Sequence, residues 1–351
     1  MARSDIDWGQ VKRILVVRLR SIGDTVLSTP SLIALRRFIP NAEIDILLED
    51  WVAPLLDGFE GVRVITVGDR NSAKLKTANY LLGRRYDIAI NLHGGTTSSF
   101  LTKATRAKHR IGLSHYRYKR FYNHLYSSAA DFWHRDILHS AEQQLAVLGF
   151  AGVPVDDCPK SHLAVTQDAI ERLDRRLADC ASRTTYSALA LVHPTAAFAT
   201  KQWSNVNFAR TSEFLAEKGL NVIAVAAKHE SKVLRDLKSL TKIPITTFDD
   251  LSLPEITALA SRSSVFVGND SGIAHIAAAV GTPTVVVFGS SNRNHWRPWT
   301  DAPNEIVFEP FACQPCPGRI CAEFGEPKCI LNVTPSAVFT ALERVLAAAK
   351  I

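Results

Sequence analysis

A chain of 351 residues with 46% hydrophobic and 21% charged residues has room for two ordinary domains and is too apolar to be disordered. No stretch approaches the roughly 18 uninterrupted apolar residues that a membrane helix requires. The N-terminal segment also lacks an apolar signal core, so we expect a cytoplasmic protein.

The excess of positive charge lies almost wholly in the first half of the chain. Residues 1–160 hold 22 Lys and Arg against 16 Asp and Glu, which supplies +6 of the overall net charge of +7. A basic half favours an anionic partner such as nucleic acid, acidic lipid headgroups or a phosphorylated substrate. Solvated side chains that merely keep the protein in solution are the alternative.

Short apolar runs alternate with amphipathic segments, a pattern typical of βαβ units on parallel sheets. In the first half we predict strands at 14–18, 43–48, 63–67 and 87–92, and helices at 24–38, 73–84 and 137–150. Glycines and prolines then interrupt the pattern, and we place a linker at about 151–163.

The second half repeats the alternation. We predict strands at 188–192, 221–226, 245–248, 265–268 and 284–288, helices at 205–218, 230–240, 254–261 and 271–280, and a final helix at 335–349. The expected fold is α/β, with two open domains, residues 1–155 and 156–351, facing a central cleft. Ligands of such sheets bind beyond the carboxyl ends of the strands.

The segment 265–289 carries the densest group of candidate residues. A buried strand is followed by Asn269, Asp270, Ser271 and Gly272, and then by a helix of small residues. Ser271 is a natural N-cap, and the free N–H groups of the first helical turn favour an anion. His275 lies one turn further along, where it would touch the same ligand or serve as a core histidine.

Two further strand ends carry polar side chains. Thr195 and Lys201 follow the predicted strand 188–192, and a lysine beside an anion site neutralises a diphosphate. Glu230 follows the strand 221–226, where a carboxylate can accept the hydroxyls of a ribose. A surface lysine and a first-turn helix acid are the structural alternatives.

Asp24 follows the first strand, at a turn that holds one glycine instead of a glycine-rich phosphate loop. It is either a favourable acid at a helix N-terminus or a general base that takes a proton from a hydroxyl. The missing G-x-G-x-x-G argues against an NAD-dependent oxidoreductase.

Four motifs, at residues 13–40, 192–203, 228–231 and 268–289, together resemble the ADP-heptose:lipopolysaccharide heptosyltransferases, glycosyltransferase family 9. The resemblance runs in order from residue 13 to the C-terminus. It implies a GT-B fold with a first Rossmann-like domain for the acceptor and a second for the ADP-sugar. The final helix would pack back on the first domain. It also implies inverting, metal-independent transfer of heptose to a sugar hydroxyl, at the inner face of the cytoplasmic membrane.

The resemblance also assigns roles to individual residues. Asp24 matches the general base, and Lys201 assists departure of ADP. The donor-binding positions are Thr195, Lys201, Glu230, Leu251, Asp270, Ser271, Gly272 and His275, with Leu251 lining the adenine pocket. Arg18 and Arg20 would position an anionic acceptor. So would Arg117, Lys119 and Arg120, which lie in the segment 102–126 with seven Lys or Arg and no acidic residue.

Two departures from the family pattern stand out. One extra residue separates Thr195 from Lys201, and Ala226-Ala227-Lys228 replaces the usual glycine-proline turn before Glu230. Both bear on the geometry of the nucleotide.

Cys313, Cys316, Cys321 and Cys329 form a cluster with spacing C-x2-C-x4-C-x7-C. It would hold structural Zn or Fe, as in related protein heptosyltransferases, or remain a set of reduced thiols.

The acceptor stays open between the inner-core Kdo, a first or second heptose, and a protein serine, the last as an O-heptosyltransferase with a cysteine-bound metal. A non-enzymatic alternative is a nucleic-acid-binding protein that uses the basic segment 102–126. The family resemblance implies no nucleic-acid partner.

Overall fold

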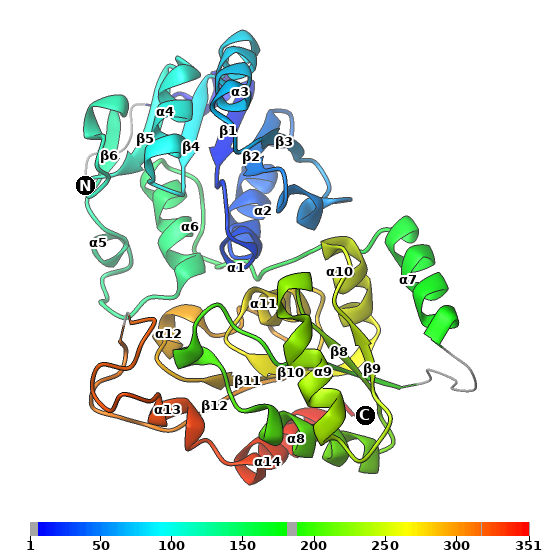
Figure 1. Ribbon diagram of the computed structural model, residues 1–351. Coiled ribbons are helices and arrows are strands. Elements are labelled where there is room, and N and C mark those ends of the chain that lie inside the picture. The colour runs from blue at the N-terminus through cyan, green and yellow to red at the C-terminus, as the bar shows by residue number, and fades with distance from the viewer. Residues whose placement is uncertain (1–5, 181–187, 317, 351) are drawn as a thin grey trace. The chain divides into compact units, whose positions relative to one another are not determined.

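The computed structural model describes residues 6–180, 188–316 and 318–350. The described chain forms two compact units, the first ending at Ala164 and the second beginning at Val165. Each unit contains a six-stranded parallel sheet with helices packed on it (Figure 1). Among the described helices, none combines the length and apolar character needed to cross a membrane.

The first unit follows the βα alternation that the sequence predicts. Its strands are β1 (Arg13–Val17), β2 (Glu43–Glu49), β3 (Arg63–Val67), β4 (Ile88–Asn91), β5 (His109–Leu113) and β6 (His124–Tyr126). Its helices are α1 (Ile22–Val26), α2 (Thr29–Phe38), α3 (Asn71–Arg84), α4 (Thr96–Ala104), α5 (Ala129–Trp133) and α6 (Ser140–Phe150), with short 3₁₀ turns at η1 (Trp8–Gln10), η2 (Ala53–Leu56) and η3 (Lys119–Phe121).

The second unit is built in the same way. Its strands are β7 (Leu189–His193), β8 (Asn221–Val225), β9 (Thr246–Phe248), β10 (Ser263–Asn269), β11 (Thr284–Phe288) and β12 (Asn304–Phe308). Its helices are α7 (Gln167–Cys180), α8 (Asn205–Glu217), α9 (Ser231–Leu240), α10 (Leu253–Ser261), α11 (Gly272–Ala279), α12 (Arg293–Trp296), α13 (Lys328–Leu331) and α14 (Pro335–Ala348), with 3₁₀ turns at η4 (Ala199–Lys201) and η5 (Lys228–Glu230).

The order of the strands places a possible ligand site in each unit. The sheets run β3-β2-β1-β4-β5-β6 and, from the other edge, β9-β8-β7-β10-β11-β12, the doubly wound order of a Rossmann fold. The order reverses between β1 and β4 in the first unit and between β7 and β10 in the second. Ligands of open α/β sheets bind beyond the carboxyl ends of the strands at this reversal.

Each sheet has its own hydrophobic core. In the first unit, Leu15 and Val17 of β1 pack in a cluster with Leu81 of α3 and Leu101 of α4. In the second, α14 buries its apolar face in a cluster that includes residues of β7, β8, β10 and β11. Burial of this kind is the main stabilising contribution to both sheets.

The helix predicted at 24–38 is in fact two helices, α1 and α2. Pro30 lacks the N–H that would bond to the carbonyl of Val26, and the hydroxyl of Thr29 donates to that carbonyl instead, at 2.7 Å. The hydroxyl of Ser28 donates in the same way to the carbonyl of Thr25. The break ends α1 just after Asp24 and keeps that residue on a short helix of its own.

The structure also contains elements that the apolar pattern does not predict. Strands β5 and β6 lie inside the basic segment 102–126, and the edge strand β12 is only half-buried. Helix α4 and helix α7 were likewise not predicted. Helix α7 buries only Ala169, Leu173 and Leu177, a narrow stripe on a mostly charged helix.

Candidate functional site

The loops after β7, β8 and β10 bring four of the predicted donor residues together as two hydrogen-bonded pairs. The hydroxyl of Thr195 donates to Glu230 Oε2 at 3.0 Å. Lys201 Nζ lies 2.8 Å from Asp270 Oδ2. Both pairs lie where the strand order reverses, at the ends of neighbouring strands. The structure therefore places a polar cluster at the position where this fold binds ligands.

Lys201 and Asp270 form a largely buried ion pair. The side chain of Lys201 is 22% exposed and that of Asp270 only 6%. The ring of Phe198 flanks the lysine, with its centroid 5.8 Å from Nζ. A lysine on a loop beside a helix N-terminus can exchange its carboxylate partner for an incoming phosphate.

Asn269 fixes both ends of the loop that carries Lys201. Its amide Nδ2 donates to the carbonyl of Pro194 and its Oδ1 accepts from the backbone N–H of Trp203, each at 3.0 Å. Asn269 itself is fully buried. We did not predict this role from sequence, where Asn269 is only one residue of a turn.

Helix α11 begins at Gly272, as expected, but its cap differs from the prediction. Ser271 occupies the N-cap position, yet its hydroxyl makes no capping bond and lies 3.1 Å from His193 Nδ1. The first-turn N–H groups of α11 thus keep no side-chain partner from Ser271. His275, one turn further along, is only 5% exposed.

His193 is another residue on this side whose role we did not predict from the sequence. It ends β7, and its Nε2 lies 3.1 Å from the hydroxyl of Thr195. Burial lowers the pKa of His193 to about 4, although the nearby carboxylate of Glu230 acts in the opposite direction. The imidazole is therefore neutral at pH 7. Its place at the end of a strand beside Thr195 is the sequence signal that could have identified it.

Glu230 is held in this cluster by a second hydrogen bond, and Leu251 lies on a neighbouring loop. Glu230 Oε2 also accepts the N–H of Ala227 at 3.1 Å, so the Ala-Ala-Lys turn still orients the carboxylate. Leu251 lies in the loop between β9 and α10, half-buried. Because β9 pairs with β8, this loop follows the strand next to the one that leads to Glu230.

In the first unit, Asp24 lies on α1, the short helix that follows β1. One of its carboxylate oxygens forms an ion pair with Arg18, and the other accepts the hydroxyl of Ser21 at 3.0 Å. Arg18 also donates to the carbonyl of Leu92, at the end of β4. Arg20 is 62% exposed and lies 3.7 Å from Glu49. The side chain of Asp24 remains 23% exposed, so solvent or a ligand can reach it.

His93 is a third residue whose role we did not predict from the sequence. It follows β4, the neighbour of β1, in a turn held by the buried side chain of Asn91. Burial lowers the pKa of His93, the positive charges of Arg18 and Arg20 add to this, and Asp24 opposes it. His93 therefore lies within electrostatic reach of Asp24.

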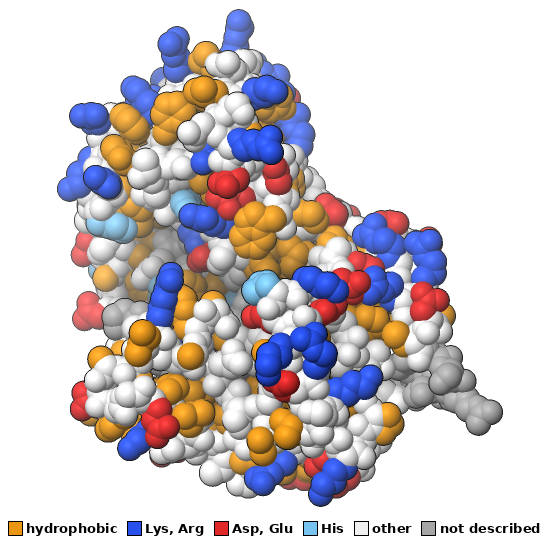
Figure 2. Space-filling view, in the orientation of Figure 1, with side chains coloured by type: hydrophobic (Ala, Val, Ile, Leu, Met, Phe, Trp, Pro, Cys, Tyr) orange, Lys and Arg blue, Asp and Glu red, His pale blue; other side chains and the backbone are white. Residues whose placement is uncertain are grey.

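The basic segment 102–126 spans the end of α4 and both strands β5 and β6. Arg117, Lys119 and Arg120 are exposed, whereas Tyr116 is buried and donates to the carbonyl of Asn91. The rings of Tyr118 and Phe121 stack at 5.5 Å, with Arg117 and Arg120 each 5.7 Å from one of them. On the face drawn in Figure 2, basic side chains also gather over α3 and α4, with apolar side chains between them.

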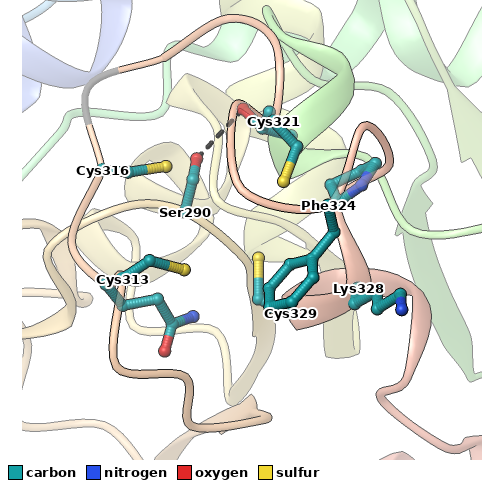
Figure 3. A pocket seen from close by; sticks show the side chains of 10 residues that line it. Ser290, Cys313, Cys316, Cys321, Phe324, Lys328 and Cys329 are labelled. Atoms are coloured by element: carbon teal, nitrogen blue, oxygen red, sulfur yellow. Dashed lines mark hydrogen bonds between the residues drawn. The ribbon is translucent and has the colours of Figure 1, made fainter.

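All four clustered cysteines line one small pocket (Figure 3). Burial raises the pKa of the Cys329 thiol, and the other three thiols add to the effect. Within the residues that the structure describes, no group of three or more His, Cys, Asp or Glu side chains that could hold a metal ion is present. As they stand, the thiols share a pocket without forming a ready ligand set.

The cysteine pocket and the loop that carries Lys201 have one residue in common, Thr200, which forms a shared wall between them. Thr200 lines the pocket, accepts the hydroxyl of Ser290 at 3.0 Å and donates to the carbonyl of Gly318 at 2.9 Å. The guanidinium of Arg319 stacks on the same Phe198 ring that flanks Lys201, 5.0 Å from its centroid. The loop that holds the cysteines is thereby attached to the loop that holds the lysine.

Comparison with known proteins gives consistent matches. Glycosyltransferase family 9 (heptosyltransferase) matches residues 74–325. The chain is 28% identical over 350 residues to lipopolysaccharide heptosyltransferase 3 of Escherichia coli strain K12, covering 93% of this chain and 96% of the relative.

Solved structures show the same fold. E. coli ADP-heptose lps heptosyltransferase II superimposes with a TM-score of 0.80 at 20% identity, over 97% of this chain and 100% of that one. The iron-containing dodecameric glycosyltransferase TibC from enterotoxigenic E. coli gives a TM-score of 0.59 at 15% identity, over 97% and 77%. The predicted fold class, an α/β GT-B architecture of two Rossmann-like units, is confirmed.

Proposed function

Because the chain belongs to glycosyltransferase family 9, the heptosyltransferases, we propose that it transfers heptose from ADP-heptose to a sugar hydroxyl of the lipopolysaccharide inner core. The observation that carries this proposal is the polar cluster of Thr195, Lys201, Glu230 and Asp270 at the strand reversal of the second unit. The name of the E. coli relative supports the acceptor class.

The second unit would bind the donor. Glu230 accepts the ribose hydroxyls through the oxygen that Thr195 and Ala227 leave available, and Leu251 packs against the adenine. The first-turn N–H groups of α11, which begins at Gly272, face the diphosphate. Asp270, Ser271 and His275 lie at the sugar end.

Lys201 would exchange partners when the donor arrives. In the structure its ammonium is paired with Asp270, and a diphosphate carries more negative charge than one carboxylate. The lysine then stabilises the charge that develops on ADP as the glycosidic bond breaks. Fixed positive charge of this kind supplies the leaving-group assistance that a divalent ion provides in other transferases.

Asp24 would act as the general base. The acceptor oxygen attacks the anomeric carbon, its proton passes to the Asp24 carboxylate, and the bonding pair of the breaking bond leaves with ADP. A single displacement of this kind inverts the configuration. Arg18, paired with Asp24, orients the carboxylate, and the exposed side chain of Arg20 contacts acidic groups of the acceptor.

The first unit would bind the anionic acceptor. Arg117, Lys119 and Arg120 are exposed beside the stacked Tyr118 and Phe121, an arrangement suited to phosphates and sugars of a core oligosaccharide. The basic and apolar surface over α3 and α4 suits contact with an anionic membrane face, where such a glycolipid lies.

One specific observation favours a second candidate, a protein O-heptosyltransferase with a structural metal. The thiols of Cys313, Cys316, Cys321 and Cys329 share one pocket, and four thiolates are ligands that Zn²⁺ or Fe²⁺ prefers. The thiols would have to draw together to bind it. Metal content per chain in wild type, Cys316→Ser and the control Cys180→Ser decides whether the cluster binds a metal, because Cys180 lies exposed on α7. Transfer of heptose to a protein acceptor decides the acceptor class.

The test of the main proposal separates binding from chemistry. Wild type should bind ADP without added divalent metal and transfer heptose from ADP-heptose to a heptose-deficient core acceptor. Asp24→Asn should bind ADP with wild-type affinity and lose transfer by at least about a hundredfold, the typical contribution of a general base. Unchanged transfer by Asp24→Asn, or no ADP binding by wild type, would contradict the proposal.

A further inference from the structure

His193 connects two loops of the donor site through its two ring nitrogens. Its Nε2 lies 3.1 Å from Thr195 Oγ1, and its Nδ1 lies 3.1 Å from Ser271 Oγ. The side chain is 7% exposed, and the strand it ends is packed against Gly268 of β10. No role for this residue follows from the proposed chemistry alone.

The direction of the hydrogen bonds can be worked out from the carboxylate at one end. Glu230 can only accept, so the hydroxyl proton of Thr195 is used in the bond to Glu230 Oε2. The contact between Thr195 and His193 then needs the ring to donate, which places the imidazole proton on Nε2. A neutral ring has one N–H, so Nδ1 is an acceptor and Ser271 donates to it.

We propose that His193 is a positioning residue of the donor site that, as the Nε2–H tautomer, fixes the hydroxyls of Thr195 and Ser271. Because the proton of Ser271 is engaged by His193, its hydroxyl presents lone pairs to the donor. It therefore accepts from a sugar hydroxyl of the donor and does not donate to a phosphate oxygen. This inference rests on the proposed function, since it assumes that the donor lies against Ser271.

The rest of the site is consistent with this division of roles. Phosphate oxygens need donors, and the backbone N–H groups at the start of α11 and the ammonium of Lys201 supply them. Ser271 makes no capping bond to its own helix. The hydroxyl of Ser271 is thus oriented to accept a hydrogen bond from a donor group of the ligand.

The first test is spectroscopic and does not depend on activity. Protein labelled with ¹⁵N-histidine is measured at pH 7, and His193→Gln identifies the signal among eleven histidines. We expect a protonated Nε2 and an unprotonated Nδ1. The opposite tautomer, or a doubly protonated ring at this pH, would overturn the inference.

The second test uses ligand discrimination. Ser271→Ala should weaken binding of ADP-heptose about three- to tenfold and leave binding of ADP unchanged, as expected for loss of one hydrogen bond to the sugar. Equal losses for both ligands would assign Ser271 to the phosphates and overturn the inference.

The third test compares two replacements of His193. Leucine removes both hydrogen bonds and should raise the KM for ADP-heptose about tenfold, with a smaller change in kcat. Glutamine retains one donor and one acceptor and should recover most of the loss. Equal behaviour of both variants and wild type would contradict the positioning role. If His193→Leu does not fold, the tautomer and Ser271→Ala measurements decide.

Failure of the two proposals can be told apart. If wild type binds neither ADP nor ADP-heptose, the proposed function fails, and the tautomer result still describes the side-chain network. If wild type binds both ligands and the variants at 193 and 271 bind them equally well, only the inference about His193 fails.

Discussion

At the scale of single residues, the pairing of Lys201 with Asp270 bears on the affinity of the donor site for ADP. Asp270 is almost fully buried, so removal of the lysine would leave a buried carboxylate without its partner and a diphosphate without its cation. We expect Lys201→Ala to weaken ADP binding about 10- to 100-fold, the range for charge-assisted hydrogen bonds. Calorimetric titration measures this.

A matched control is available in the same unit. Lys218 forms a 2.8 Å ion pair with Glu343, but both side chains are about half-exposed. Exposed pairs contribute little, so Lys218→Ala should bind ADP as wild type does. If both lysine variants lose affinity equally, the effect on Lys201 is one of net charge and not of position.

His193 also gives a residue-scale prediction about pH. Its pKa is about 4 in the folded protein, against an ordinary value near 6.5 in the unfolded chain. As pH falls from about 6.5 towards 4, the unfolded chain takes up the proton first, so the free energy of unfolding falls, by up to about 3 kcal/mol. Above pH 6.5 the residue contributes no pH dependence.

Denaturant unfolding of wild type and His193→Gln between pH 4 and 7.5 checks this. His93 and His109, whose pKa values burial also lowers, are present in both proteins, so the difference isolates His193. The glutamine variant should lose less stability on acidification. Identical slopes for the two proteins would show that the histidine at 193 is not buried as a neutral ring.

At the scale of elements, the close approach of β7 and β10 depends on Gly268. A Cβ at this position would lie 2.9 Å from the carbonyl oxygen of His193 and 2.7 Å from Cζ of Phe266. We expect Gly268→Ala to lower the free energy of unfolding by about 1–3 kcal/mol, as overpacking does, and to weaken ADP binding. Urea denaturation and titration measure the two effects.

At Gly83, substitution by alanine should have the opposite effect on stability from the same substitution at Gly268. It lies inside α3, and a Cβ there would meet nothing within 4 Å. Gly83→Ala should therefore stabilise the protein by about 0.5–1 kcal/mol through helix propensity. If both alanine variants lose stability, the close approach at Gly268 is not the cause.

The elements also show how far the sequence alone leads. Buried parallel strands such as β1 and β11 are continuous apolar runs and were predicted within a residue or so. Strand β5 has Ile111 and Leu113 between basic residues, so its sheet position follows from pairing with β4 and not from its own composition. The division of α1 from α2 depends on Pro30, which the sequence shows, and on side-chain bonds to two carbonyls, which hydrophobic periodicity does not reveal.

The site divides in the same way. Thr195, Lys201, Glu230 and Asp270 could be predicted because each follows a strand in a recognisable motif. His193 has a sequence signal, its place at a strand end beside Thr195, but its contact with Ser271 has none. The roles of Asn269 and His93 could not be predicted, because they arise from burial and from contacts between loops distant in sequence.

At the scale of the whole molecule, the two units have separate sheets and separate cores, and the proposed function assigns them different ligands. ADP at about 100 times its dissociation constant should stabilise the unit that binds it by about 2.7 kcal/mol. We expect hydrogen exchange to slow in the loops after β7, β8 and β10 and to remain unchanged at Asp24 and the segment 102–126. Protection confined to the first unit would reverse the assignment.

The shared wall at Thr200 has a practical consequence for inhibition. Three of the four pocket cysteines are partly exposed, and the residue that separates their pocket from the donor lysine is a single threonine. A small electrophile that alkylates Cys313, Cys316 or Cys321 would occupy this small pocket and push against Thr200, whose hydroxyl donates to the carbonyl of Gly318. The displaced loop carries Lys201. A covalent ligand on the thiols would therefore weaken binding of the donor without occupying the nucleotide site.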